Sequence, residues 1–506
     1  MRRSAFEFLN AQRLAIFFLL LLPVVSGFRG KLADPDLWWH LKAGEWIVEH
    51  RAVPWNDPFS YTAAGQPWIA YSWLAEVLFF ELARTFGYHA LIFLKSAAAL
   101  AMMGFVYLSA RKAGARGPAA TLTSALVALA TVGVWSERPQ LLSLVLLAAL
   151  VWILQSEEKR RRLVWLGPLL VALWANVHIL FFVGVGLLGL AALCESIERR
   201  PSGRLWSATA LSAVATLVTP YGWRLLAHIP TMIHQPAIGQ AVAEFRSPDF
   251  GTLLGLLIGL FVVASIVVIA LSRERLTLFE LVTFAGSLAM GLYMIRNIPI
   301  FAILAAPTLA RRLDGLLPAA SPLPERAPPP ALLALHYALL IGGIVLAGSL
   351  APRDRGWREN LAPELFPVAA ADFVAERYPD ARLFNDFDWG GFLIFRLTPR
   401  MLVSIDGRTQ VYGEQILDAY TRTHYILNGW EKFLKSCRPD IVLWPRESSL
   451  AQVLRELPRW RVVYEDKIAV VFERVEMERA RSRASLEGEG HLASAGIMMV
   501  SGNGDR

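Results

Sequence analysis

The chain has 506 residues, of which 55% are hydrophobic and only 18% are charged, and its mean hydropathy is +0.43. This composition excludes an ordinary soluble domain and indicates a polytopic membrane protein. The net charge of +8 does not indicate nucleic-acid binding, because the basic residues fall in short clusters between apolar segments, where membrane topology places them. We therefore expect membrane lipids, and no nucleic acid, among its partners.

Apolar segments recur along the first 350 residues and predict an α-helical protein with about eleven membrane spans, several of them shorter than the usual ~20 residues. The segments are 11–28, 88–110, 118–134, 141–156, 163–175, 179–195, 205–219, 251–271, 278–295, 298–313 and 331–350. The first has a basic flank like that of a signal sequence, but no small-residue cleavage site follows it, so we expect an uncleaved anchor.

Lysines and arginines gather in alternate connections between these segments, and by the positive-inside rule that side is cytoplasmic. The basic residues concerned are Arg111, Lys112, Arg116, Lys159, Arg160, Arg161, Arg162, Arg199, Arg200, Arg204, Arg273, Arg275, Arg311 and Arg312. We therefore expect a multi-pass protein of the inner (plasma) membrane with a cytoplasmic N-terminus. An odd number of spans then places the C-terminal region on the periplasmic or extracellular side.

The loop 29–87 is the first long external connection, and it predicts two amphipathic helices that lie on the membrane surface. Asp34 is a good N-cap for a helix from Asp36 to about Glu49, whose tryptophans suit the headgroup level. A second helix from about Ser72 to Phe86 is expected to end at Gly87.

The chain changes composition after the last span. We expect a transmembrane domain at 1–350, an external α/β domain at 351–475 and a disordered tail at 476–506. Alternating apolar patterns predict the strands Arg382–Phe384, Val403–Ile405, Ile441–Trp444, Val462–Tyr464 and Ala469–Phe472, with helices around Tyr412–Tyr425 and Leu450–Leu457.

Two polar segments of the C-terminal domain admit two interpretations. DFDWGGFLIF (386–395) and SIDGRTQVYG (404–413) place acids, glycines and Arg408 at strand ends, where they could form a sugar- or acceptor-binding edge. Alternatively the glycines serve tight turns and Asp406 pairs with Arg408.

Unusual polar residues fall at nearly every external helix end, which suggests a cavity shared by water and substrate, because ionisable groups are costly at membrane depth. They are Asp34, Asp36, His40, Glu137, Arg138, Gln140, Asn176, His178, Tyr221, Arg224, Glu244, Arg246, Asp249, Arg296 and Asn297. Each also fits a role as an interfacial cap or a snorkelling side chain. We favour a functional role for Arg138 and Arg296, because their short loops leave them little freedom to reach bulk water.

Asp34 and Asp36 together stabilise the start of a helix by roughly 1 to 2 kcal/mol, and capping does not exclude catalysis. His40 follows Asp36 by one helical turn and shares its face. Lys95, two turns inside the second span, either snorkels outward or holds a lipid phosphate. No phosphate-binding glycine loop, Cys/His metal set or G-x-S-x-G elbow is present in the sequence, so nucleotide-driven and hydrolase chemistries have no motif support.

Several segments between about residues 10 and 475 form a recognisable set: DPDLWWHLKAGEWI, NDPFSYTAAGQPWIAYSWLAEVLF, ERPQ, WANVH, TPYGWR, EFRSPDF and RNIPIFAILAAP. Through these segments the chain resembles the little-characterised bacterial members of the GT-C superfamily of integral membrane glycosyltransferases. The W-W-D-Y-G signature of oligosaccharyltransferases is absent, since Trp389-Gly390-Gly391 follows Asp388, so protein N-glycosylation is disfavoured.

The resemblance implies transfer of a hexosyl or pentosyl group from a polyprenyl-phosphate donor to a lipid, glycan or protein acceptor at the outer face. It also implies that Asp36 or Asp34 acts as the catalytic base or holds a divalent cation, Mg or Mn; no cofactor is indicated otherwise. The residues expected to contact the substrates are His40, Arg138, His178, Glu244, Arg296 and Lys95.

Two other functions share these features. A transporter or flippase of lipid-linked sugars would have the same spans, but such proteins place charged sites near the midplane between internal repeats, and no repeat is visible. A non-catalytic assembly protein of the cell envelope would use the two aspartates as caps only.

Overall fold

The structure is a computed structural model that describes residues 10–155, 162–233, 243–318 and 329–475. It divides into two compact units. Unit 1 comprises residues 1–55 and 69–362, and unit 2 comprises residues 56–68 and 363–506. The segment 56–68 of the first external loop therefore packs with the C-terminal part of the chain, whereas we had kept the whole loop with the transmembrane domain. The predicted tail, 476–506, lies outside the described residues.

All eleven apolar segments are helical in unit 1. Their helices are α1 (Ala11–Arg29), α4 (His89–Lys112), α5 (Gly117–Thr131), α6 (Pro139–Leu154), α8 (Gly167–Val177), α9 (Phe181–Ile197), α10 (Gly203–Ala215), α13 (Leu253–Leu271), α14 (Leu278–Tyr293), α15 (Ile298–Leu316) and α16 (Pro330–Leu350). Shorter elements complete the unit: η2 (Val132–Val134), η3 (Val164–Leu166), α11 (Trp223–Ile233), η4 (Ala243–Phe245), η5 (Ile295–Asn297) and α17 (Trp357–Asn360).

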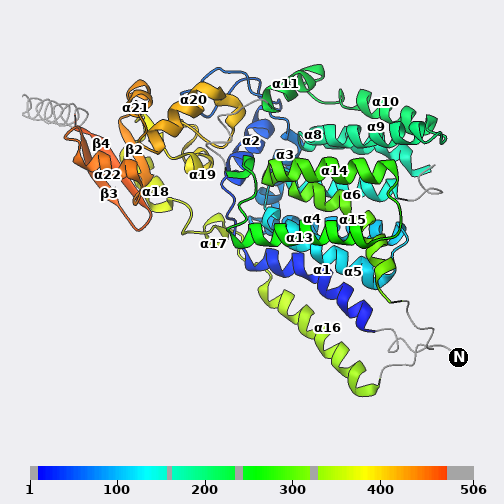
Figure 1. Ribbon diagram of the computed structural model, residues 1–506. Coiled ribbons are helices and arrows are strands. Elements are labelled where there is room, and N and C mark those ends of the chain that lie inside the picture. The colour runs from blue at the N-terminus through cyan, green and yellow to red at the C-terminus, as the bar shows by residue number, and fades with distance from the viewer. Residues whose placement is uncertain (1–9, 156–161, 234–242, 319–328, 476–506) are drawn as a thin grey trace, which may run out of the picture. The chain divides into compact units, whose positions relative to one another are not determined.

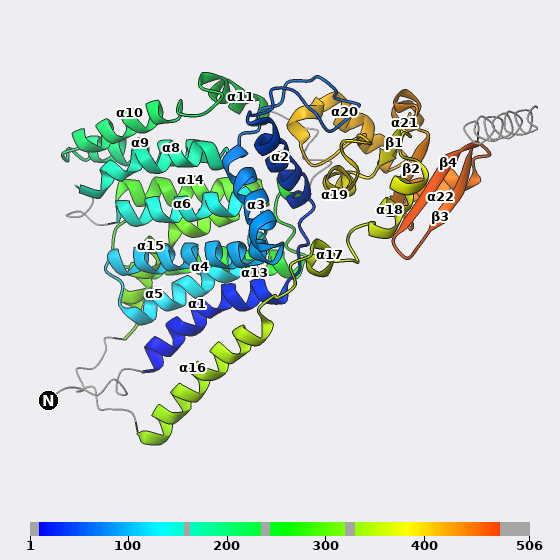
Figure 2. The ribbon, with the colours of Figure 1, turned by 180° about the vertical axis from the view of Figure 1, so that it is seen from behind.

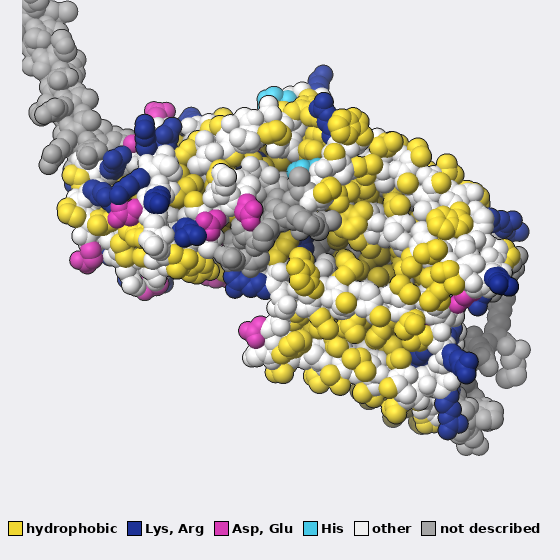
Figure 3. Space-filling view, turned by 45° about the horizontal axis from the view of Figure 1, so that its top comes forward, with side chains coloured by type: hydrophobic (Ala, Val, Ile, Leu, Met, Phe, Trp, Pro, Cys, Tyr) yellow, Lys and Arg dark blue, Asp and Glu magenta, His cyan; other side chains and the backbone are white. Residues whose placement is uncertain are grey.

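The long helices have the length and composition of membrane spans. Within the described residues, α1, α4, α5 with η2, α13 and α16 are long and apolar enough to cross a membrane, and α6, α8 with η3, α9 and α14 are shorter apolar helices. Hydrophobic side chains cover much of the visible face of unit 1 (Figure 3), and several on α13 are more than half exposed. Such exposure suits a lipid solvent, so the chain is a multi-pass membrane protein; eleven spans remain a prediction.

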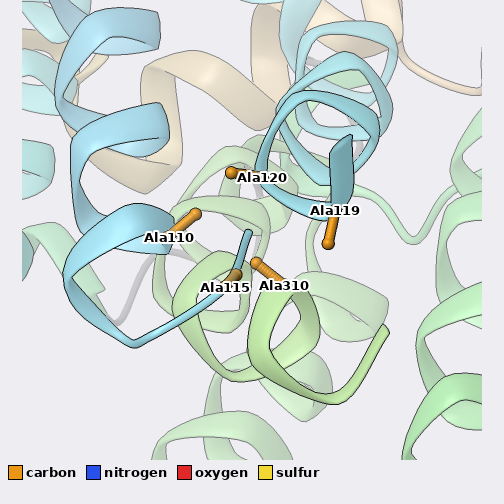
Figure 4. Packing of buried hydrophobic residues seen from close by; sticks show 5 residues of the cluster. All are labelled: Ala110, Ala115, Ala119, Ala120 and Ala310. Atoms are coloured by element: carbon orange, nitrogen blue, oxygen red, sulfur yellow. The ribbon is translucent and has the colours of Figure 1, made fainter. Parts of the chain in front are cut away.

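Small residues allow the central helices to approach one another. Ala110, Ala115, Ala119, Ala120 and Ala310 form a buried cluster at which the end of α4, the following turn, α5 and α15 meet (Figure 4). In membranes, where apolar side chains gain little by leaving lipid, alanine at a helix interface permits close backbone contact. These helices lie side by side in both ribbon views (Figures 1 and 2).

The two expected surface helices are α2 (Leu37–His50) and α3 (Trp73–Phe86). They pack against each other and lie across one end of the helical bundle (Figures 1 and 2). Helix α3 ends as expected at Gly87, whose φ of 98° favours glycine and whose N–H donates to the carbonyl oxygen of Ala83. Helix α2 begins one residue later than expected, with Asp36 rather than Asp34 at the N-cap position.

Gly44 sets how closely α2 and α3 approach. A Cβ atom on this residue would lie 2.1 Å from the backbone carbonyl oxygen of Glu76, on α3. Only glycine leaves room for this contact, which fixes α2 on α3 and thereby the position of the acids at the start of α2.

Unit 2 contains a mixed four-stranded sheet, as an α/β domain requires. Its strands are β1 (Leu383–Asn385), β2 (Ile441–Pro445), β3 (Trp460–Glu465) and β4 (Ala469–Arg474), in the order β1-β2-β4-β3. β1 and β2 are parallel, and β4 is antiparallel to both β2 and β3. The helices are α18 (Val368–Arg377), α19 (Phe387–Leu397), α20 (Thr409–His424), α21 (Glu431–Cys437) and α22 (Ser449–Glu456).

The prediction of a strand at 403–405 is wrong. Val403 makes a single parallel bridge with Ser60, in which its N–H donates to Phe59 at 3.1 Å and its carbonyl accepts from Tyr61 at 3.1 Å. The apolar pattern at this place therefore serves contact with the inserted segment 56–68 and not with the sheet.

Arg408 joins that inserted segment to the C-terminal part. Its Nη1 donates to Oδ1 of Asp57 at 2.7 Å, and its Nε and Nη2 donate to the two oxygens of Asp406 at 2.8 and 2.7 Å. The Tyr412 hydroxyl also donates to Asp406. We call these four residues the Arg408 cluster.

The Arg408 cluster is closed to solvent. The side chains of Arg408, Asp57 and Asp406 are 0% exposed, and the rings of Phe59 and Trp68 face the guanidinium at 5.0 and 4.7 Å. The predicted pairing of Asp406 with Arg408 is therefore confirmed, and these two side chains are not accessible to a sugar. A binding edge formed by other residues of 386–395 and 404–413 stays a prediction.

Candidate active site

Asp34 lies at the turn that leads into α2, and both of its carboxylate oxygens are engaged. Nε of Arg138 lies 2.7 Å from Oδ1 and 2.6 Å from Oδ2, and the backbone N–H of Asp36 donates to Oδ1 at 3.0 Å. Asp34 thus holds the start of α2 against the start of α6. It is buried, at 8% exposure, and its oxygens are not free to take a proton from a substrate.

Arg138 is the centre of a group that we call the Arg138 cluster, with Asp34, Asp36 and Glu244. It stands at the N-cap position of α6, where Pro139 begins the helix. Its Nη2 lies 3.3 Å from Oδ2 of Asp36, and its Nη1 lies 2.9 Å from Oε1 of Glu244. Burial alone would lower the pKa of Arg138, but the three carboxylates outweigh it and raise that pKa well above its usual value.

Asp36 is less constrained than Asp34. Its Oδ1 accepts from Nε1 of Trp39 at 3.1 Å, and the side chain is 24% exposed. Burial and the neighbouring charge of Asp34 raise the pKa of Asp36 above its ordinary value, although Arg138 opposes this. A partly accessible carboxyl group with a raised pKa is suited to accept a proton near neutral pH.

A cavity of about 180 Å³ adjoins the Arg138 cluster. Its lining combines polar residues with apolar ones, the latter mostly from η2, α13 and the start of α15. The lining residues are Asp34, Ala130, Gly133, Val134, Ser136, Arg138, Gln140, Glu244, Leu254, Ile258, Ile295, Arg296, Ile298 and Pro299. Such a space suits a molecule with one charged end and one hydrocarbon end.

Arg296 lines the same cavity but has a different environment from Arg138. Its guanidinium lies over the ring of Phe245, 4.3 Å from the centroid, and within the described residues it makes no ion pair. Burial lowers its pKa from the usual value, and Glu244 only partly offsets this. Of the two arginines that the sequence singled out, Arg296 is the one whose donors are not taken by carboxylates.

His40 lies in a buried pair that the sequence analysis missed. Its Nδ1 is 3.1 Å from Oε1 of Glu76, which is only 1% exposed, and the Trp39 ring packs on the imidazole with centroids 3.5 Å apart. Glu76 interrupts the apolar pattern WLAEVLFF of α3. That signal, an acid on the buried face of an interfacial helix, could have identified it.

His178 and Lys95 occupy buried positions near the same end of the bundle. Nδ1 of His178 is 3.3 Å from Oγ of Ser143, and burial with the charge of Arg296 lowers the pKa of His178 to about 3, so this imidazole is neutral. Lys95 is 7% exposed and forms an ion pair with Glu137. The charge of Lys95 is therefore met by an acid at the start of α6 and not by bulk water.

The first-loop acids do not fit a divalent cation in this arrangement. The guanidinium of Arg138 occupies the point at which Asp34, Asp36 and Glu244 converge. In the described ranges, no group of three or more His, Cys, Asp or Glu side chains is arranged to hold a metal ion. The catalytic roles described below are therefore assigned to side chains and not to a metal ion.

No protein-family model matches the sequence, and no curated protein matches it. Among solved structures, the chain is similar to the arabinofuranosyltransferase AftD from Mycobacteria, with a TM-score of 0.50 and 15% identity over 92% of this chain and 40% of AftD. It is also similar to the oligosaccharyltransferase AglB from Archaeoglobus fulgidus in complex with an inhibitory peptide and a dolichol-phosphate, with a TM-score of 0.52 and 12% identity over 86% of this chain and 70% of AglB. The apo form of the Archaeoglobus enzyme gives a TM-score of 0.50 at 12% identity, over 85% of this chain and 69% of that one.

These similarities confirm the fold that the sequence resemblance implied. The chain has the GT-C fold of integral membrane glycosyltransferases, with a helical membrane unit and a small α/β unit. It spans less than half the length of AftD and about 70% of AglB. At such low identity the likeness establishes the fold, and the activity has to be argued from the site.

Proposed function

We propose that the chain is a membrane glycosyltransferase that moves a hexosyl or pentosyl group from a polyprenyl-phosphate donor to a lipid, glycan or protein acceptor at the outer face of the membrane. The observation that carries this proposal is the Arg138 cluster, in which Asp36 is a partly accessible carboxylate. The cluster adjoins a cavity that is lined also by apolar residues and by Arg296, which makes no ion pair within the described part of the chain. The dolichol-phosphate bound to AglB, which has a similar fold, supports the class of donor.

The residues divide the reaction between them. Asp36 accepts the proton of the acceptor hydroxyl, whose oxygen then forms a bond to the anomeric carbon of the sugar. The bond from that carbon to the phosphate oxygen breaks at the same time, and the polyprenyl phosphate leaves with the electron pair. Phosphate is a good leaving group, so a base and a cation suffice without a general acid.

Arg296 is the cation assigned to the phosphate. It lines the cavity and makes no ion pair within the described residues, and apolar lining residues such as Ile298 and Leu254 accommodate the first isoprene units. Arg138 is instead held by three carboxylates. Asp34 is a positioning residue, since its contacts orient Arg138 and the start of α2.

The orientation rests on the distribution of basic residues. Arg111, Lys112, Arg311 and Arg312 lie at ends of α4 and α15 remote from the start of α2, as a cytoplasmic side requires. The candidate site then lies at the outer face, where a lipid-linked donor and a glycan acceptor can meet.

The test is the substitution Asp36→Asn, which retains the shape of the side chain and removes its basicity. We expect normal membrane insertion and a loss of at least about a hundredfold in transfer from a radiolabelled polyprenyl-phosphate sugar in purified membranes. Glu45→Gln, on the same helix, is the matched control, because among the described residues Glu45 forms an ion pair only with Lys42, three residues before it. Near-normal transfer by Asp36→Asn would remove Asp36 as the base and leave it the role of a cap.

A further inference from the structure

The resemblance to GT-C proteins implies that a first-loop acid acts as the catalytic base or holds a divalent cation, and the geometry around Arg138 disagrees with the second of these alternatives. Each of the three guanidinium nitrogens faces a different carboxylate: Nε faces Asp34 at 2.6 Å, Nη2 faces Asp36 at 3.3 Å and Nη1 faces Glu244 at 2.9 Å. These acids come from the start of α2 and from η4, so the fold gathers them around one cation.

The three carboxylates carry the negative charge of a metal site, but the arrangement leaves no room for a metal ion between them. Three carboxylates gathered around one cation are a hard, anionic ligand set of the kind that Mg²⁺ and Mn²⁺ prefer. Here the space between them is filled by a planar group that is permanently charged and presents fixed donors to several carboxylates at once, one nitrogen to each acid. A lysine would present its three donors from a single nitrogen, whereas the guanidinium spreads its donors over three nitrogens in one plane.

We propose that Arg138 is a built-in substitute for a divalent cation. It holds Asp34, Asp36 and Glu244 together, so that the native site takes no metal, and its removal creates a site for a divalent cation. The consequence that sugar transfer needs no added metal rests on the proposed function; the metal-binding property does not.

The surroundings of Arg138 allow the exchange. Its side chain is 20% exposed and lines the 180 Å³ cavity, so truncation opens the space between the carboxylates to water. Mg²⁺ and Mn²⁺ retain several water ligands when bound, and three protein carboxylates with water would complete an octahedral shell. Arg296 lines the same cavity with no ion pair in the described part of the chain, so its truncation removes an equal charge without freeing carboxylates.

The experiment measures binding of Mn²⁺ to the full chain in detergent, from the loss of the electron paramagnetic resonance signal of free Mn²⁺. We expect Arg138→Ala to bind Mn²⁺ at least about tenfold more tightly than the wild type. The double variant Arg138→Ala with Asp36→Asn should bind Mn²⁺ about tenfold more weakly than Arg138→Ala alone. Arg138→Lys keeps a positive charge at the site, and Arg296→Ala removes a positive charge beside it. Both variants should bind Mn²⁺ no more tightly than the wild type. Mn²⁺ should also raise the melting temperature of Arg138→Ala and leave that of the wild type unchanged.

Two results would overturn the inference. One is a wild type that itself binds Mn²⁺ and loses this binding on Asp34→Asn, a measurement that does not require any Arg138 variant to fold. The other is a folded Arg138→Ala protein, with the elution profile of the wild type, that gains no affinity for Mn²⁺.

Activity separates this inference from the proposed function. If the wild type transfers sugar only after Mn²⁺ or Mg²⁺ is supplied, and loses transfer on chelation, then Arg138 does not replace the metal but the proposed function stands. If no polyprenyl-phosphate donor is used at all while Arg138→Ala gains affinity for Mn²⁺, then the proposed function fails and the inference about Arg138 stands.

Discussion

The Arg138 cluster of unit 1 and the Arg408 cluster of unit 2 use the same chemistry in two different settings. In each cluster, one guanidinium binds a carboxylate that is far from it in the sequence. Arg138 and Asp34 are 104 residues apart, and Arg408 and Asp57 are 351 residues apart. In the Arg408 cluster the paired side chains are all 0% exposed. In the Arg138 cluster, Asp36 is 24% and Glu244 is 44% exposed, and the group adjoins a cavity.

The difference shows that burial, and not the presence of an Arg–Asp pair, separates a structural cluster from a candidate site. Carboxylates sealed in the interior need their cation, because an unpaired buried charge costs several kcal/mol. Carboxylates that adjoin a cavity can instead be solvated by water, or can bind a substrate or another ion, when their arginine is removed. The comparison leads to four predictions, which follow from the largest expected effect to the smallest.

The largest effect is expected for Arg408→Met. It leaves Asp57 and Asp406 buried without their cation, which should destabilise unit 2 by about 3–5 kcal/mol. Limited proteolysis of residues 363–475 and the thermal unfolding midpoint both report this loss. Arg446→Ala, which breaks an exposed pair with Glu465, should change the stability by less than about 1 kcal/mol. Wild-type protease resistance of Arg408→Met would contradict the structural role of the cluster.

Arg138→Met is the matched substitution in the other cluster, and we expect a smaller loss. Water can reach Asp36 and Glu244 once the guanidinium is gone, so the cost should be about 1–3 kcal/mol. The two methionine variants are compared by thermal unfolding in the same detergent. Equal destabilisation by both would mean that the Arg138 cluster is as much a structural element as the Arg408 cluster.

Gly44→Ala tests how the position of the first-loop acids depends on helix packing. The added Cβ meets the backbone carbonyl of Glu76, so α2 must shift, at a cost of about 1–2 kcal/mol after the gain in helix propensity. Gly104→Ala on α4 is the control, because nothing lies within 4 Å of its Cβ, and it should be neutral or stabilising. An unchanged melting temperature for Gly44→Ala would show that α2 adjusts freely.

Arg296→Lys should have the smallest effect, and only on activity. The ammonium keeps the charge but not the planar array of donors, so transfer should fall by about tenfold through a higher KM for the donor. Stability should not change, since the described residues give Arg296 no carboxylate partner within ion-pair distance. A lower melting temperature together with an unchanged KM would assign Arg296 a structural role.

Much of the fold could be predicted from local pattern. Every apolar segment is helical, and α2 and α3 begin and end within a residue or two of the predicted bounds, because helix formation and capping depend on neighbouring residues. The strand predicted at 403–405 failed for the opposite reason. Its partner is the distant segment 56–68, and an extended apolar run does not show what it will pair with.

The sequence by itself determined that this is a helical membrane protein with acids and arginines at one set of helix ends, since hydropathy and capping are properties of short windows. Only the tertiary structure decided which partner each of these acids and arginines has. Both oxygens of Asp34 accept from Arg138, and Asp36 stays partly accessible. Arg138 contacts three carboxylates, whereas Arg296 lies over an aromatic ring. It also paired Lys95 with Glu137 and His40 with Glu76. The fold brings together ion-pair partners that are distant in the sequence, and their burial sets the free-energy cost of breaking the pair. Neither the partners nor this cost can therefore be predicted from residue spacing.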